Sequence, residues 1–584
     1  MVGFVSCEKN SKTETTDQAA MKDTLQLNNL LSEYHEERLK FYPLEATFAG
    51  DNRYNDTLPN NISQSYLSQL KDFYSGYKNK LGELDYNELS ESEKLSYDIL
   101  QWECDINLES MKYPTHLMPL DQFWSLHISI GQLASGASAQ PFKTTEDYEN
   151  WLKRLDDFTV WCDTAIVNMK KGIESGWVLP KSLAKKVIPQ IADLTQGTIQ
   201  DHLFYSPVRA LPEGFSDDDK TLFTEKYTTM LDEKVVPTFK KLHDFLKNEY
   251  LPACRESSGA TGLPNGEAYY AFRIKQYTTT NKSADEIFEL GKSEVARLRS
   301  EMEKVKEQVG FKGDLMAFFD HVRANKKLMP FSDANEVIEN FNEIHDRMKP
   351  QLAELFDLVP KTPFEVRRTE AFREASASAE YNPGSLDGTR PGIFYVPIPD
   401  VKKYNLFSDE SLFLHEAIPG HHYQISLQQE NEELPEFRRT LWYSSYGEGW
   451  ALYSESLGKE LGLYTDPYQY FGMLSAEMHR AIRLVVDAGM HAKGWTREQA
   501  IQYSLENEAE SKESITSEIE RYMALPGQAL SYKVGQLKIL ELRKNARDKM
   551  GDKFDIKVFH NKVLESGCVP LALLEEKINR WISE

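Results

Sequence analysis

Apolar residues recur at steps of three and four positions from about residue 26 to residue 370, with charged residues between them. The segments 285–305 and 334–355 show the pattern most clearly, and a proline in the second is expected to kink it. Ser283 and Glu286 have the spacing of a capping box at the start of the first segment. Because this periodicity places the apolar side chains on one face of a helix, the sequence predicts a mainly α fold.

A chain of 584 residues, 40% of them hydrophobic, can form two or more lobes or one large helical body. We expect a tether over residues 1–25, a helical region over 26–375 and a region carrying the chemistry over 376–584, the last two in one continuous fold. The net charge of −23 argues against nucleic acid and against an anionic lipid surface as partners, because both require a surplus of Lys and Arg.

A short β-type run, residues 393–396 (IFYV), interrupts the helical pattern between two turn-forming stretches, 382–384 and 388–392. It predicts a small sheet or hairpin beside the chemistry-bearing region. An exposed strand edge there would bind an extended peptide through main-chain hydrogen bonds, and we assign Arg390 and Tyr395 as substrate-binding candidates. An ordinary hairpin that packs the core fits the pattern equally well.

Residues 415–422 (HEAIPGHH) resemble the zinc-protease signature HExxH, with two residues inserted before the second histidine. In the ordinary motif, two histidines on one helix face hold a zinc ion, and the glutamate acts as general base on a water molecule at the metal. We expect a helix that begins near Ser408, capped by its side chain. It should end near Ile418, since a residue before proline avoids the α conformation and Pro419 has no amide hydrogen.

The second metal ligand depends on how the chain accommodates the inserted Pro-Gly pair. In a straight helix, position i+6 points to the far side, and position i+7 lies about 10 Å further along the axis. A bulge at the Pro-Gly pair would bring His421 into the place of the usual second histidine. We therefore assign His415 and His421 as ligands and Glu416 as general base, with His422 as the alternative second ligand.

A catalytic zinc site usually has three protein ligands, and the candidate third lies in residues 446–455 (YGEGWALYSE). Glu448 and Glu455 are seven residues apart, so they share one helix face. The glycines on either side of Glu448 permit close approach of a neighbouring backbone. We assign Glu448 as the third ligand and Glu455 as its support. Taken alone, both carboxylates would be interpreted as solvated residues of a helix.

The apolar helix predicted over residues 479–492 carries His479, Arg483, Asp487 and His491 at four-residue steps. Asp487 is expected to orient Arg483, His491 or both, because buried polar groups need partners. We assign His491 as a catalytic candidate that could stabilise an oxyanion. A self-satisfied buried ion network is the alternative interpretation, and we favour it for most of these four residues.

A second cluster of polar candidates lies where a helix should stop at residues 526–527 (PG) and another should begin. Zinc peptidases need a hydrogen-bond donor facing the tetrahedral intermediate, and Tyr532 is our candidate. Arg521 is assigned as a clamp for a substrate carboxylate, with Gln528 as a further substrate-binding residue. Tyrosines are also common core residues in this chain.

The first residues resemble the end of a bacterial lipoprotein signal. Residues 4–7 (FVSC) are similar to a lipobox, in which the cysteine, here Cys7, becomes the acylated first residue. Residues 8–24 are polar, and we expect them to form a flexible tether. Only six residues precede Cys7, so the interpretation is a trimmed lipoprotein, and chance likeness is the alternative. No apolar run approaches the ~20 residues that span a bilayer, and no cysteines form a CxxC pair.

Four segments together resemble a bacterial family labelled as a domain of unknown function and grouped with the HExxH-type zinc peptidases. They are HEAIPGHH, GEGWALYSE, RLVVDAGMHAKGW and RYMALPGQALSYKVG, and the resemblance runs from about residue 26 to the C-terminus. Many members of the family look like lipoproteins. The resemblance therefore implies a periplasmic location in the bacterial cell envelope, with a lipid anchor as the membrane attachment.

The wider peptidase clan implies a mostly helical body around a deep cleft, as in thimet-type oligopeptidases, with one zinc ion and peptide substrates. Residues 447–451 (GEGWA) also resemble the ligand-bearing segment of gluzincin aminopeptidases, which supports Glu448. Dipeptidyl-peptidase-III-like enzymes carry HExxGH, so a longer motif is compatible with zinc. The leading hypothesis is a zinc metallopeptidase. The alternatives are a non-catalytic peptide-binding lipoprotein, against which Glu416 speaks, and a zinc amidase or esterase.

Overall fold

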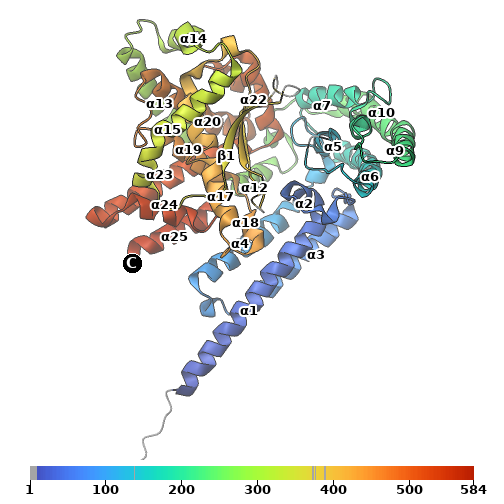
Figure 1. Ribbon diagram of the computed structural model, residues 1–584, viewed down its shortest axis with the longest axis horizontal. Helices are drawn as coiled ribbons and strands as arrows, with labels where there is room; N and C mark the ends of the chain where they lie inside the picture. The colour runs from blue at the N-terminus through green and yellow to red at the C-terminus, as the bar shows by residue number, and fades with distance from the viewer. Residues whose placement is uncertain (1–9, 137, 371–373, 375–376, 387, 389) are drawn as a thin grey trace, which may run out of the picture.

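The computed structural model of the chain is mainly α-helical with one small sheet, which confirms the predicted fold class (Figure 1). It describes residues 10–584 except residues 137, 371–373, 375–376, 387 and 389, and it describes side chains from residue 24 onward. The N-terminal helices are α1 (Asn10–Phe41), α2 (Pro43–Ala49), α3 (Gln64–Leu81) and α4 (Glu91–Ser110).

The buried apolar side chains form two separate cores. The smaller core belongs to a lobe, shown on the right of Figure 1, that the sequence analysis did not predict as a separate unit. Its helices are α5 (Leu126–Ala134), α6 (Thr145–Ser175), α7 (Lys181–Asp193), α8 (Ser206–Arg209), α9 (Asp217–Met230), α10 (Val236–Phe245) and α11 (Leu251–Ala253).

The larger core belongs to the main body, which α1, α3, α4 and all later helices build. The later helices are α12 (Gly266–Thr278), α13 (Ala284–Gln308), α14 (Leu315–Ala324), α15 (Ala334–Leu355), α16 (Asp409–Glu416), α17 (His421–Glu430), α18 (Glu436–Arg439), α19 (Ser444–Ser456), α20 (Pro467–Lys493), α21 (Arg497–Leu505), α22 (Lys512–Ala524), α23 (Ser531–Met550), α24 (Ile556–Leu564) and α25 (Leu571–Ser583). Helices α15 and α16 lie on either side of the boundary expected between residues 375 and 376, and both contribute to this core. The boundary itself stays a prediction.

The two helices with the clearest apolar periodicity form where the sequence places them. Helix α13 begins with the predicted capping box, in which the Ser283 side chain accepts from the Glu286 amide and the Glu286 side chain accepts from the Ser283 amide. Helix α15 contains Pro350 near its C-terminal end. Both helices bury their apolar stripe against the main body, which is the arrangement that the periodicity indicates.

Helix α1 begins at Asn10, inside the segment that the sequence analysis expected to be a flexible tether. Polarity alone does not prevent helix formation, and the tether expected over residues 1–25 stays a prediction. Residues 10–41 contain no glycine or proline, and Lys, Glu, Gln and Ala are good helix formers. In the part of the chain that the structure describes, no helix has both the length and the apolar character needed to cross a membrane.

The sheet has three strands in the order β1-β3-β2, which are β1 (Phe364–Arg368), β2 (Glu380–Asn382) and β3 (Gly392–Val396). The central strand β3 is the predicted β-type run. It pairs in parallel with β1 and antiparallel with β2. Strand β3 buries Phe394 and Val396 in the larger core, whereas β2, at one edge of the sheet, lines a cleft.

Helices α19 and α23 cross at a pair of glycines, which brings their backbones unusually close. A Cβ atom added to Gly535 would lie 1.8 Å from the Ser445 carbonyl oxygen, and one added to Gly449 would lie 2.5 Å from the Gly535 Cα atom. Only hydrogen side chains fit at this crossing, because both obstacles are backbone atoms. The crossing therefore fixes the position of the residue next to Gly449, which is Glu448.

The glycine crossing predicts a large stability effect for Gly535→Ala. The added methyl group should force α19 and α23 apart and lower the free energy of unfolding by about 3 kcal/mol, the upper part of the usual range for overpacking. Chemical denaturation of the two proteins measures this difference. Gly76→Ala is the matched control, since no atom lies within 4 Å of its new Cβ and it should leave stability equal or slightly higher. Equal stability of Gly535→Ala and the wild type would contradict the account.

Candidate metal centre

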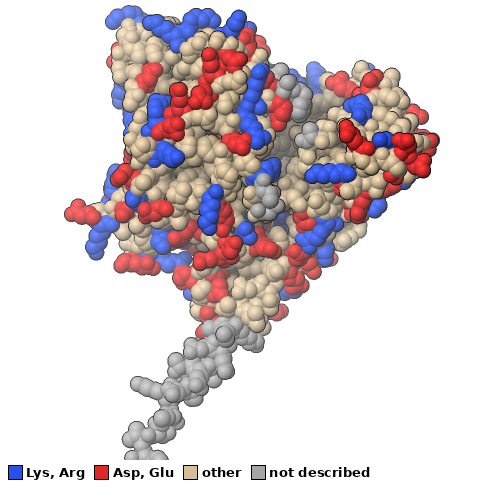
Figure 2. All heavy atoms as spheres, viewed as in Figure 1, with Lys and Arg blue, Asp and Glu red and all other residues tan. Residues whose placement is uncertain are grey.

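A cleft of about 2470 Å³ lies between the main body and the smaller lobe, where Figure 2 shows the surface hollowed. The main body contributes His415, Glu416, His421 and Glu448 to its walls. Helices α5 and α7 of the smaller lobe contribute the opposite wall, which includes Gln190. The expected chemistry-bearing residues therefore share one solvent-accessible space.

The HEAIPGHH segment forms two helices with a break between them. Helix α16 ends at Glu416, residues 417–420 form the break, and α17 begins at His421. The predicted bulge within one helix is therefore incorrect. A Cβ at Gly420 would lie 1.9 Å from the His415 carbonyl oxygen, so glycine is needed where the chain turns back against α16. The Trp450 indole N–H fixes the break by donating to the Pro419 carbonyl oxygen at 2.7 Å.

The start of α16 also differs from the expectation. Ser408 stands at the N-cap position, but its side chain makes no capping hydrogen bond. The amide of Glu410 instead donates to the Gln469 side chain at 3.1 Å. A tertiary contact thus satisfies an amide at the helix start, which no local sequence pattern indicates.

Three candidate ligand atoms converge from three helices, α16, α17 and α19. The Nε2 atoms of His415 and His421 lie 3.5 and 3.4 Å from the same Glu448 oxygen, Oε2. All three ligand atoms lie within 4.8 Å of one another. In a tetrahedral zinc site with bonds of about 2.0–2.1 Å, two ligand atoms are about 3.3–3.4 Å apart. The residues present therefore fit a zinc ion in both donor type and spacing.

His415 is held from its other side by Glu455. The Nδ1 atom donates to Glu455 Oε1 at 2.7 Å, and Ser411 donates to the second oxygen, Oε2, at 2.6 Å. Because an ionised carboxylate only accepts, Nδ1 carries a hydrogen, and Nε2 faces Glu448 across the cleft. Loss of the Nε2 proton, which metal binding requires, would free a lone pair at this position. The supporting role predicted for Glu455 thus agrees with the geometry.

The centre attracts positive charge. Burial alone lowers the pKa of His415, but the hydrogen bonds to Glu448 and Glu455 outweigh it and raise the pKa to about 9. Burial alone raises the pKa of Glu448, but His421 and His415 outweigh it and hold the pKa well below its ordinary value. A cation is therefore favoured where the three ligand atoms meet.

The two adjacent histidines of the motif point to different places. His422 Nδ1 lies 2.9 Å from the Tyr381 hydroxyl of β2, and its ring packs on Phe364 of β1. Burial lowers the pKa of His422 to about 4. His421 faces Glu448 and packs against the Trp442 ring, with 5.8 Å between ring centroids. The geometry favours His421 as the ligand and gives His422 the role of joining α17 to the sheet.

Glu416 and Tyr532 both line the cleft beside the three candidate ligands. Burial raises the pKa of the Glu416 carboxyl, and within the described residues this carboxyl has no hydrogen-bond partner. Burial also raises the pKa of Tyr532, and the charge of Glu448 raises it further. Tyr532 therefore keeps its proton at neutral pH, as a hydrogen-bond donor must.

The structure does not bring His491 to the cleft. Its Nδ1 atom accepts from the Ala260 amide at 2.9 Å, and its Nε2 atom lies 3.0 Å from the Tyr522 carbonyl oxygen. The ring is fully buried, and burial lowers its pKa to about 3. The catalytic role that the sequence suggested for His491 is therefore withdrawn, because both ring nitrogens are occupied by backbone groups.

Asp487 differs from the expectation in a similar way. Its carboxylate accepts from the Tyr270 hydroxyl at 2.6 Å and from the Gly527 amide at 3.2 Å, and it does not orient Arg483 or His491. It joins α12, α20 and the turn after α22. The alternative interpretation of the polar stripe, a buried structural network, is the better one for Asp487 and His491.

The remaining predicted substrate contacts divide into two groups. Arg521, Arg390 and Tyr395 line the cleft, Arg390 as an exposed residue. Gln528 is buried behind the wall and accepts from Arg521 Nη1 at 2.7 Å, so it positions Arg521 and does not line the cleft. Arg480, which was not among the residues predicted from the sequence, also lines the cleft. The three-residue spacing of Arg480 and Arg483 on one helix is the signal that could have found it.

A second group of metal-binding residue types, His35, Glu36 and Glu436, also lines the cleft. Arg53 donates to the Glu36 carboxylate at 2.7 Å, which commits this carboxylate to an ion pair. We assign no metal to this group.

Comparison with known proteins places this fold in a family. The family model described as "Bacterial protein of unknown function (DUF885)" matches residues 43–578. The chain belongs to this family. The match begins at residue 43, somewhat after the start near residue 26 that the resemblance indicated. No curated protein matches the sequence significantly.

Two solved structures resemble this DUF885 protein over nearly their whole lengths. A crystal structure described as "the putative lipoprotein from Colwellia psychrerythraea" is 29% identical, with a TM-score of 0.87, and the alignment covers 96% of this chain and 99% of that one. A "putative lipoprotein of unknown function from Shewanella oneidensis" is 18% identical, with a TM-score of 0.74 and coverage of 96% and 100%. The second likeness shows the fold alone.

The ligand geometry predicts a large effect for one of the two adjacent histidines and a small effect for the other. His421→Ala should weaken zinc binding by more than the roughly 10–100-fold that loss of a supporting residue costs, because a direct ligand is removed. His422→Ala should weaken it by less than about tenfold. The zinc affinity of each variant is measured by its zinc content after dialysis and by competition with a chromogenic chelator. Loss of zinc in His422→Ala with retention in His421→Ala would reverse the assignment.

Proposed function

We propose that this DUF885 protein is a zinc-dependent metallopeptidase that hydrolyses oligopeptides in the cleft between its two lobes. The convergence of two imidazole nitrogens and one carboxylate oxygen at zinc-like spacing carries the proposal. The Glu416 carboxylate, which lines the same cleft and has no hydrogen-bond partner among the described residues, supports catalysis over simple metal storage.

His415, His421 and Glu448 would hold the ion, and Glu455 would orient His415. When bound, zinc polarises a substrate carbonyl and lowers the pKa of a water molecule. This ligand set has three protein donors, which is the number typical of catalytic sites, whereas structural zinc sites have four. The donor set thus favours a catalytic role.

Glu416 would act as the general base, accepting a proton from the attacking water and delivering it to the leaving amine. Tyr532 would donate a hydrogen bond from its hydroxyl to the oxyanion as it forms. Strand β2 lines the cleft at the edge of the sheet, so a peptide could lie beside it in extended form. Tyr395 and Arg390 would contact substrate from the same side.

The proposal extends to location. The two structural neighbours are described as putative lipoproteins, which agrees with an envelope location. Cys7, the residue that acylation would modify, lies outside the described residues. Mass spectrometry of the protein from its native host should find a diacylglyceryl group on this cysteine, and an unmodified Cys7 would end this part of the proposal.

Glu416→Gln should lower the rate of peptide hydrolysis by about 10²–10⁴-fold, the usual contribution of a general base, and should leave zinc bound. The measurement is cleavage of a mixed peptide library with zinc content determined in parallel. Glu436→Gln is the matched control, since Glu436 also lines the cleft but groups with His35 and Glu36 and not with the three candidate ligands, and this variant should retain full activity. Full activity of Glu416→Gln would refute the mechanism, and peptide binding without cleavage by the wild type would favour the non-catalytic alternative.

A further inference from the structure

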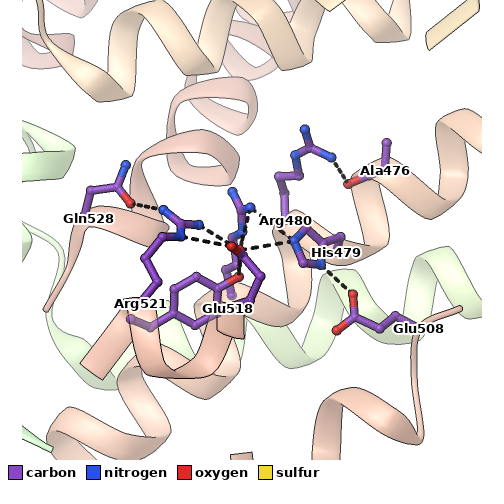
Figure 3. A network of polar contacts seen from close by, with 9 residues as sticks. Ala476, His479, Arg480, Glu508, Glu518, Arg521 and Gln528 are labelled. Carbon is purple, nitrogen blue, oxygen red and sulfur yellow. Dashed lines mark hydrogen bonds and ion pairs between the residues drawn. The ribbon is translucent and has the colours of Figure 1, made fainter. Parts of the chain in front are cut away.

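Three arginines gather on one wall of the cleft. Arg480 and Arg483 come from α20 and Arg521 comes from α22, and all three line the cleft together with Tyr532. Figure 3 shows Arg480 and Arg521 on either side of Glu518. The chain has a net charge of −23, so a local excess of arginine needs a specific reason. Mutual repulsion of guanidinium groups makes such a cluster costly unless anions neutralise it.

The protein supplies too few anions for this cluster. Glu518 is the one carboxylate that the described residues place in ion-pair contact with these arginines, and it accepts from Arg483 Nη2 at 3.1 Å and from Arg521 Nη2 at 2.8 Å. Arg480 donates to the Ala476 carbonyl oxygen at 3.2 Å and has no carboxylate partner. Glu508 is committed to His479 (Figure 3). Among the described residues, one carboxylate thus pairs with two of the three guanidinium groups and none pairs with the third, Arg480.

Two of the guanidinium groups also have unmet donors. In the described part of the chain, Arg483 Nη1 and Arg480 Nε are buried without a hydrogen-bond partner. Arg483 is only 7% exposed, so its unpaired N–H groups carry a real desolvation cost. A purely structural network would be expected to satisfy these donors internally, as Gln528 does for Arg521. An anionic ligand entering the cleft would satisfy them instead.

The cluster lies beside the candidate catalytic residues. The guanidinium carbon of Arg483 is 4.5 Å from the centre of the Tyr532 ring, and that of Arg480 is 6.0 Å from it. Tyr532 also lines the cleft together with Glu448, and burial and the Glu448 charge together raise the pKa of the Tyr532 hydroxyl. An extended peptide covers about 3.3–3.6 Å per residue, so an anion bound by the arginines would lie within about two residues of the reacting bond.

We propose that Arg480, Arg483 and Arg521 bind a carboxylate of the peptide substrate, so that the enzyme cleaves bonds within about two residues of that carboxylate. This inference deepens the proposed function and rests on it for the position of the reacting bond. The planar guanidinium fork matches a carboxylate through two parallel hydrogen bonds. Both a C-terminal carboxylate and an Asp or Glu side chain offer this chemistry.

Binding to an inactive protein tests the subsite without turnover. The probes are acetylated tetra-alanine with a free C-terminus, the same peptide with a C-terminal amide, and that amide with one alanine replaced by aspartate. Each is titrated calorimetrically into zinc-loaded Glu416→Gln. The free acid should bind at least about tenfold more tightly than the plain amide, which is the strength of one charge-assisted hydrogen bond. Equal affinity of the acid and both amides would overturn the proposal.

Three further variants show where the carboxylate binds. Arg480→Gln, added to Glu416→Gln, should remove most of the preference for the acid. Arg439→Gln is the matched control, since Arg439 also lines the cleft, is also partly buried and also donates to one backbone carbonyl, that of Gln429. It should leave the preference unchanged. A preference that persists in both the Arg480→Gln and the Arg483→Gln proteins would assign the carboxylate to another place and overturn the proposal.

The outcomes separate this inference from the proposed function. Tight binding of the aspartate-containing amide would identify side-chain carboxylates as the source, and tight binding of the free acid alone would identify the C-terminus. Hydrolysis by the wild type without any acid preference would leave the peptidase proposal standing and remove the subsite. Arginine-dependent binding of the acid without hydrolysis by the wild type would keep the carboxylate subsite and remove the peptidase proposal.

Discussion

The contact between His415 and helix α19 determines the rest of the site. Glu448 and Glu455 lie two helical turns apart on one face of α19, and they contact the two different nitrogens of the same imidazole ring. This arrangement requires α19 to be held rigidly against α16. The glycine crossing with α23 provides that constraint, because the two backbones meet with no side chain between them. One helix thus carries both a candidate metal ligand and the group that orients another.

The Pro-Gly insertion is compatible with this constraint because the chain does not continue as one helix. The break over residues 417–420 lets α17 start again with His421 facing Glu448, while His422 turns toward the sheet. The same insertion therefore gives two neighbouring histidines different roles. Helices of the smaller lobe line the opposite side of the cleft from the candidate metal ligands.

The sequence predicted those features that depend on local periodicity. The seven-residue spacing of Glu448 and Glu455 placed both on one face, and the proline at position 419 predicted the helix end. The choice between His421 and His422 could not be made, because it depends on the backbone path through the break. His491 was misassigned because its partners, the Ala260 amide and the Tyr522 carbonyl, are distant in sequence. The smaller lobe was missed since its helices have the same periodicity as those of the main body.

The most direct test of the central claim is anomalous diffraction at the zinc absorption edge from crystals grown with zinc. The account predicts one zinc ion bonded to His415 Nε2 and His421 Nε2 at about 2.0–2.1 Å and to a Glu448 oxygen at about 2.0–2.2 Å. An anomalous peak on His422, or none at His415 in crystals that otherwise show the same cleft, would contradict it.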